Sequence, residues 1–74
     1  MEINNFIKEI LEYEKEYEII ITTTGGVYFI CYDDNYYKCG DLGNIIYKEL
    51  EVLAFDLFNK IMCRNENIIE ISNE

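Results

Sequence analysis

Residues 32–41 read YDDNYYKCGD and concentrate carboxylates, an amide and aromatic rings in one short stretch. Asp33 and Asp34 are adjacent acids, and paired carboxylates can divide the roles of general acid and general base. However, side chains of adjacent residues in a strand or turn point apart, and the chain has no histidine to share a proton transfer. We therefore predict that the protein is not an enzyme and that these carboxylates act as charged acceptors.

The cysteines indicate neither a metal site nor a redox framework. Cys31, Cys39 and Cys63 are odd in number and form no C-x-x-C pair, so neither zinc nor disulfide bonding is predicted. We interpret them as small buried apolar side chains. Counted from Asp33, a calcium-binding EF-hand loop would need glycine where Lys38 stands. No metal and no cofactor are expected.

Acidity is the strongest compositional signal. Fifteen Asp and Glu residues against six Lys and Arg residues give a formal net charge of −9 over 74 residues. Such a chain repels phosphate backbones and anionic lipid, because binding to either depends on clustered basic side chains. It attracts basic protein surfaces, including those that normally hold nucleic acid. We therefore expect a protein partner with such a surface, and neither direct nucleic-acid binding nor membrane binding.

Length and hydrophobicity predict a single folded domain over residues 1–74. Half of the residues are hydrophobic, so a packed core is expected despite the charge. No apolar run is long enough to cross a bilayer, and the opening MEINNFIKEI lacks the basic start and apolar stretch of a signal peptide. A cytoplasmic location is the expectation.

The first part of the chain predicts one helix followed by three strands. Apolar residues recur at helical spacing from Ile3 to about Tyr17, and Asn4 or Asn5 can cap this helix. From about Glu18, β-branched and aromatic residues take over and predict strands. The three strand-like runs are IIITTT, VYFICY and Tyr36 to Cys39. The turns between them are predicted at Gly25-Gly26, through positive φ angles, and at Asp33 to Asn35.

The register of the third strand stays open in the sequence. A two-residue loop pairs Tyr32 with Tyr37 and puts Lys38 on the face of Cys31, whereas a three-residue loop moves Tyr37 to that face. Both faces of the sheet carry apolar or aromatic residues, and two helices can cover only one. The other is expected to be an exposed tyrosine-rich interface or to pack against the C-terminal segment. The two sets are Ile20, Val27, Phe29 and Cys31 on one face, and Ile19, Ile21, Tyr28, Ile30 and Tyr32 on the other.

A second, longer helix is predicted from Ile45 to Ile61. Two residues can cap it: Asp41 and Asn44. Val52 and Phe55 lie outside its main apolar arc and either extend the core, which we favour, or form a dimer contact. Residues 67–72 predict a short strand or a helical turn. The chain is thus predicted to adopt an α+β fold of order α-β-β-β-α, in which a small antiparallel sheet of three to four strands packs on both helices.

Three stretches carry a resemblance to a known family. They are INNFIKEI opening a helix, YFICYDDNYYKCG as strand, acidic turn and strand, and NIIYKELEVLAFDLFNK as the following helix. In this order they resemble small phage-encoded anti-CRISPR proteins, type II-A inhibitors that occupy the PAM-binding cleft of the RNA-guided nuclease. The resemblance covers roughly residues 1 to 60. It implies that carboxylates and amides of the acidic turn replace the DNA groups held by the nuclease's basic PAM-reading side chains.

By position, the resemblance assigns the turn's role to Asp33, Asp34 and Asn35, and the role of an acid just before the first strand to Glu14 or Glu16. The remaining residues of the expected partner-binding set are Tyr36, Tyr37 and Asp41. The expected function is that of a non-catalytic acidic inhibitor in the cytoplasm of a bacterial host. It would bind a CRISPR effector nuclease and block access to target DNA by mimicking nucleic acid.

A second function, from a different class, stays open beside this one. The chain is then a small structural or regulatory homodimer without a CRISPR target. Its two copies would be joined through the exposed sheet face or through Val52 and Phe55.

Overall fold

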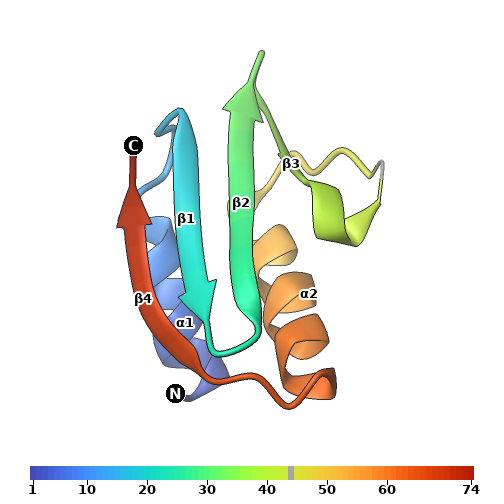
Figure 1. Ribbon diagram of the computed structural model, residues 1–74. Coiled ribbons are helices and arrows are strands. Elements are labelled where there is room, and N and C mark those ends of the chain that lie inside the picture. The colour runs from blue at the N-terminus through green and yellow to red at the C-terminus, as the bar shows by residue number, and fades with distance from the viewer. Residues whose placement is uncertain (44) are drawn as a thin grey trace.

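The computed structural model describes residues 1–43 and 45–74. Four strands form one antiparallel sheet in the order β3-β2-β1-β4 (Figure 1). The predicted α+β fold is confirmed, and the C-terminal segment forms a strand. Along the chain the elements are α1 (Ile3–Leu11), β1 (Glu18–Thr23), β2 (Gly26–Asp33), β3 (Tyr36–Cys39), the 3-10 helix η1 (Gly40–Leu42), α2 (Leu50–Cys63) and β4 (Ile68–Asn73).

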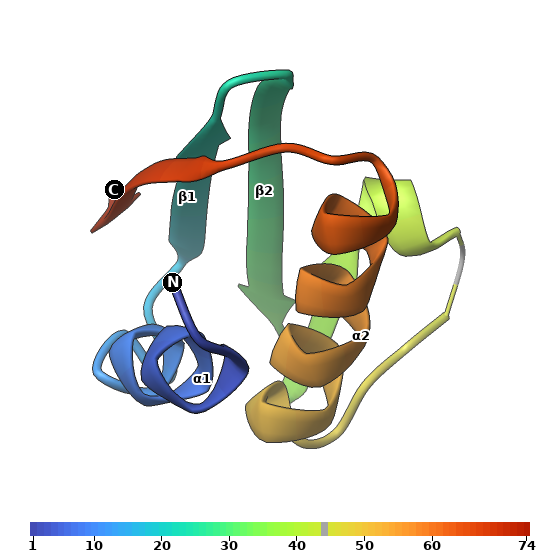
Figure 2. The ribbon, with the colours of Figure 1, turned by 90° about the horizontal axis from the view of Figure 1, so that it is seen from below.

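Both helices pack against one face of the sheet (Figures 1 and 2). Strand residues alternate between the two faces, so every second residue points toward the helices. The rings of Phe6 in α1 and Phe58 in α2 lie 5.2 Å apart at their centroids and join the two helices in the core. The buried sheet residues are Ile19, Ile21, Thr23, Tyr28, Ile30, Tyr37 and Cys39. The buried helix residues are Phe6, Ile10, Leu50, Leu53, Ala54, Leu57, Phe58 and Ile61.

The prediction of an exposed tyrosine-rich face is wrong, because the face that carries Tyr28 is buried against the helices. Burying a tyrosine requires a partner for its hydroxyl, and Tyr28 has two. Its hydroxyl donates to Glu66 Oε1 at 2.8 Å and accepts from Arg64 Nη1 at 2.8 Å. The C-terminal segment does not cover the opposite face either, since it extends the sheet beside β1. We call that opposite face the outer face; its apolar residues are Ile20, Val27, Phe29, Cys31 and Tyr36.

The long helix begins at Leu50, and the predicted start at Ile45 is wrong. Tyr47 instead pairs with Tyr37 at the edge of the sheet, through backbone N···O distances of 2.7 and 2.9 Å. Its hydroxyl donates to Asp56 Oδ2 at 2.7 Å, and burial raises the pKa of Tyr47 to about 12. Glu49, just before the helix, has extended backbone, and Ile45 is 55% exposed.

The helix caps were also predicted at the wrong residues. The first helix already begins at Ile3, so Asn4 and Asn5 lie inside its first turn. Asp41 lies inside the 3-10 helix η1 and does not cap α2. Asn44 lies outside the described residues.

Val52 and Phe55 do not extend the core. They are 48% and 50% exposed, because the core-facing side of α2 is filled by Leu53, Ala54 and Leu57. The preferred sequence interpretation of these two residues is therefore wrong, and they lie on the solvent side of the helix.

A hydrogen-bonded cluster around Glu66 closes the end of the sheet where β1 turns into β2. Glu66 Oε1 accepts from Thr23 Oγ1 at 2.6 Å and from Tyr28. The prediction of a positive φ angle at Gly25 is wrong. Thr23 Oγ1 instead stabilises the turn by accepting hydrogen bonds from the N–H groups of Gly25 and Gly26, both at 3.1 Å. Gly25 is needed for space, because a Cβ atom there would overlap the Glu66 carboxylate.

We expect Glu66→Gln to remove part of the protein's pH-dependent stability. The hydrogen bond from Thr23, and then that from Tyr28, lowers the pKa of Glu66 in the folded protein. Its stabilising contribution is therefore present above the carboxyl's unfolded pKa, and it is lost as the pH falls through the folded pKa. Urea-unfolding midpoints of both proteins, measured from about pH 6 to about pH 3, should converge as the pH falls. A gap that stays constant with pH would contradict this assignment.

Candidate partner-binding surface

One end of the sheet gathers most of the carboxylates expected to bind a partner. The loop from α1 to β1 and the turn from β2 to β3 both lie there (Figure 1). Two hydrogen bonds join these segments: Tyr32 N–H donates to the Tyr17 carbonyl at 3.1 Å, and Lys15 N–H donates to the Tyr37 hydroxyl at 3.0 Å. We call four of the exposed carboxylates of these two segments the acidic end: Glu14, Glu16, Asp33 and Asp34.

The turn between β2 and β3 is a tight two-residue loop. Asp33 pairs with Tyr36, which leaves only Asp34 and Asn35 in the loop. Their φ angles are 51° and 67°, as in a type I′ turn, and short Asx side chains tolerate this left-handed backbone. The Tyr32 hydroxyl donates to Asn35 Oδ1 at 3.2 Å. Of the two registers that the sequence left open, the two-residue loop is the one that forms.

The tyrosines of this region divide between the core and the surface. Tyr37 is 4% exposed, its ring packs at a tilt against that of Tyr32 with the centroids 4.8 Å apart, and its hydroxyl accepts a hydrogen bond from within the chain. Burial raises the pKa of Tyr37. Tyr36 is 36% exposed on the outer face. Tyr17, which the sequence assigned to the first helix, is 73% exposed beside the turn. The aromatic surface near the acidic end therefore consists of Tyr17 and Tyr36.

Asp41 lies away from the acidic end, at the far end of β3. Its Oδ1 is 3.8 Å from Arg64 Nη1, and its backbone carbonyl accepts a hydrogen bond from Lys60 Nζ. These contacts tie η1 to α2. Asp41 thus helps to hold the fold together, and the structure separates it from the four carboxylates with which the sequence grouped it.

The acidic end carries a clear excess of negative charge. Within its two segments, residues 12–17 and 33–36, the only basic side chain is Lys15. At physiological salt the screening length is about 8 Å, so carboxylates on adjoining segments act together on an approaching charge. The arrangement can therefore attract and hold clustered Lys and Arg side chains.

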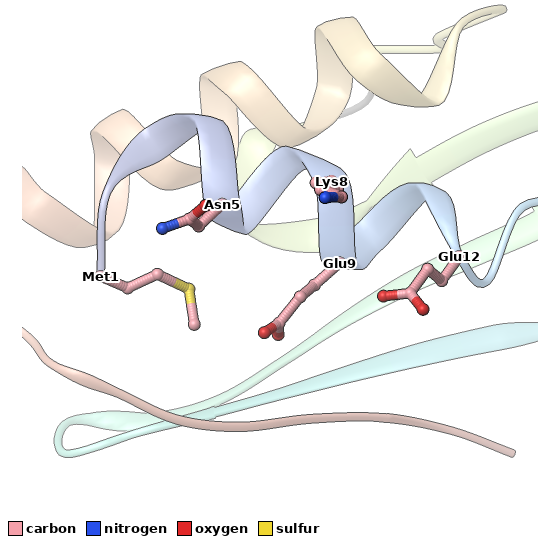
Figure 3. A pocket seen from close by; sticks show the side chains of 5 residues that line it. All are labelled: Met1, Asn5, Lys8, Glu9 and Glu12. Carbon is pink, nitrogen blue, oxygen red and sulfur yellow. The ribbon is translucent and has the colours of Figure 1, made fainter.

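The described residues show no metal centre. They include no group of three or more His, Cys, Asp or Glu side chains placed to hold a metal ion. One surface depression, of about 490 Å³, is an open groove on α1 (Figure 3). Its lining residues are Met1, Asn5, Lys8, Glu9 and Glu12.

Only one of the three cysteines is buried, so their interpretation as core residues is wrong for two. Cys39 packs in the core, whereas Cys31 lies on the outer face and Cys63 ends α2 on the solvent side. Partial burial, and then the nearby Glu18 carboxylate, raises the pKa of Cys31. A raised pKa leaves less thiolate, so Cys31 is a weak nucleophile.

No protein-family model, curated protein or solved structure matches this chain significantly. The helices that the structure describes are too short, or too polar, to cross a membrane.

We expect the conformation of the acidic turn to depend on Asn35. Replacement by alanine places a Cβ-bearing residue that lacks an Asx side chain at a φ of 67°, and should cost about 1 kcal/mol of unfolding free energy. Asn35→Gly should be neutral or slightly stabilising, because glycine adopts this backbone freely. Urea unfolding measures both, with Asn59→Ala in α2 as the control. Equal losses at positions 35 and 59 would contradict the role of the turn.

Proposed function

We propose that this protein is a non-catalytic acidic inhibitor that binds the basic nucleic-acid-binding surface of a CRISPR effector nuclease. By occupying that surface it blocks access to target DNA. The observation that carries the proposal is the acidic end. There, exposed carboxylates from two segments that are separate in sequence lie at the same end of the sheet. Hydrogen bonds join the loop after α1 to β2 and β3, and the rings of Tyr17 and Tyr36 are exposed at this end.

The chemistry of the acidic end suits this role. Arginine side chains that donate hydrogen bonds to phosphate or to the acceptor edge of guanine can donate equally well to a carboxylate. A carboxylate also offers two acceptor oxygens in one plane. Asp33 and Asp34 project from a tight turn, so little chain entropy is lost when they are bound. The exposed tyrosines add rigid contact area with few rotatable bonds.

The overall charge favours the same partner. A net charge of −9 speeds encounter with a basic cleft and disfavours binding to nucleic acid itself. Such an inhibitor competes for the protein and leaves the DNA untouched.

The test replaces the acidic turn in the full-length protein. Asp33→Lys/Asp34→Lys should weaken binding to the guide-loaded effector nuclease by at least about 30-fold, since breaking buried charge pairs typically costs about 2 kcal/mol or more. Surface plasmon resonance against a panel of guide-loaded effectors measures the affinity. Glu2→Lys/Glu9→Lys is the matched control, because it makes the same change of charge on α1. Equal losses in both variants, or no binding by the unmodified protein to any effector, would contradict the proposal.

A homodimer is the second candidate function, and the exposed side of α2 favours it. Val52, Phe55 and Met62 are 48%, 50% and 37% exposed, and their spacing places them on one side of the helix. An apolar stripe of this kind is typical of helix-to-helix contacts between copies.

The dimer is tested by Phe55→Lys. The substitution places a charge within the apolar stripe and should convert a dimer into a monomer without unfolding the chain, because the residue is already half exposed. Sedimentation velocity over a range of concentrations gives the mass. A monomeric unmodified protein would exclude this candidate.

A further inference from the structure

We propose that the outer face of the sheet is a docking surface for an apolar segment of a protein partner whose border carries lysine and arginine. The outer face lies beside the acidic end and differs from it in chemistry. That a single partner occupies both surfaces rests on the proposed function.

The outer face presents a continuous apolar surface across three strands. Ile20 in β1 pairs directly with Phe29 in β2, and Val27 lies two residues along the same strand. Phe29 and Val27 are 45% and 47% exposed, and Tyr36 of β3 is exposed on the same side. Both helices lie on the opposite side of the sheet (Figure 2). The strands therefore place Phe, Val and Ile where antiparallel sheets usually place polar residues.

This apolar surface is not required by the core. The core is closed by residues on the helix-facing side, and the side chains of the outer face add exposed apolar area that lowers solubility. A tightly packed apolar centre with a polar rim is the usual composition of a protein interface.

Charges around this surface select the type of partner. The described residues of the outer face include three carboxylates and one cation, Lys38. The carboxylates are those of Glu18, Asp33 and Glu70. A second copy of the chain docked face to face would bring like charges together, and phosphate-bearing surfaces would be repelled. A partner with an apolar centre and a basic border complements the face in both respects.

The outer face and the acidic end also adjoin. Asp33 belongs to both, since it closes the turn and its side chain lies on the side of Tyr36 and Phe29. A basic cleft that engages the acidic end therefore lies next to the apolar surface, and one partner can contact both.

A peptide titration tests the docking surface without any effector. The probe is an amphipathic helical peptide with leucine along one side and lysine at its flanks. We expect it to shift the backbone amide signals of Ile20, Val27 and Phe29 in a heteronuclear NMR spectrum. Counterparts with serine for leucine, or glutamate for lysine, should bind at least tenfold more weakly. Shifts confined to the acidic end or to α2 would overturn the proposal.

Phe29→Ser separates this surface from the acidic end. It removes the largest apolar side chain of the outer face and leaves the net charge at −9. We expect at least a tenfold weaker affinity for the peptide, while the dispersed amide signals outside the outer face show that the variant stays folded. Ile46→Ser, at a residue that is 55% exposed outside the sheet, is the control and should bind normally. Equal affinities of Phe29→Ser and the unmodified protein would overturn the proposal.

Phe29→Ser and the Asp33→Lys/Asp34→Lys variant, each measured against a guide-loaded effector, distinguish the two claims. If the effector binds, Phe29→Ser should raise the dissociation rate at least tenfold without changing the salt dependence of association. An effector that binds Phe29→Ser normally but loses the Asp33→Lys/Asp34→Lys variant would overturn the outer-face proposal and keep the proposed function. A peptide that binds the outer face while no effector binds would support the docking surface and contradict the proposed function.

Discussion

Two helices can cover only one face of a four-stranded sheet, and this limit determines which side chains of the protein are free to bind. Because strand residues alternate between faces, the choice of the covered face determines for every strand residue whether it is buried or exposed. Ile19, Ile21 and Tyr28 are drawn into the core, while Val27 and Phe29 are left in water. The outer face is thus a direct consequence of how the helices pack.

Tyrosines can be buried beneath the covered face because each buried hydroxyl has a hydrogen-bond partner within the chain. Tyr28 bonds to Glu66 and Arg64, Tyr37 accepts from the backbone of Lys15, and Tyr47 donates to Asp56. Without these partners each buried hydroxyl would carry a desolvation penalty of about 1 to 3 kcal/mol. The same bonds have a second effect. The bond between Tyr37 and Lys15 holds the loop after α1, which carries Glu14 and Glu16, against β3.

The sequence was sufficient for the types of α1, β1, β2, β3 and α2 and for the position of the acidic turn, since both follow from local patterns; it left β4 open between a strand and a helical turn. Alternation, β-branched runs and the Asx pair at 34–35 act over a few residues. Where a distant partner decides the outcome, local patterns failed. The bridge of Tyr47 to β3 shortens the long helix, and no helical periodicity contains that information. Glu66 and Arg64, which allow Tyr28 to be buried, lie 38 and 36 residues from it along the chain.

The positions of the candidate-site residues were likewise predictable from local patterns, but not where a distant contact decides them. Asp33, Asp34 and Asn35 lie in the predicted turn, and Glu14 and Glu16 lie beside it. Asp41 and Tyr37 were grouped with them because they are close in sequence, but one pairs with Arg64 and the other is buried. Tyr17 and Phe29 were missed as surface groups, since their exposure depends on where α1 ends and on which face it covers.

The most direct test of the central claim is a competition measurement. The dissociation constant of this protein for a guide-loaded effector nuclease would be measured at physiological salt with increasing amounts of a PAM-containing DNA duplex. If the acidic end occupies the DNA-binding surface, the apparent dissociation constant should rise in proportion to the DNA concentration once that surface is filled. A dissociation constant that does not change with DNA would contradict the account, because protein and DNA would then occupy separate surfaces.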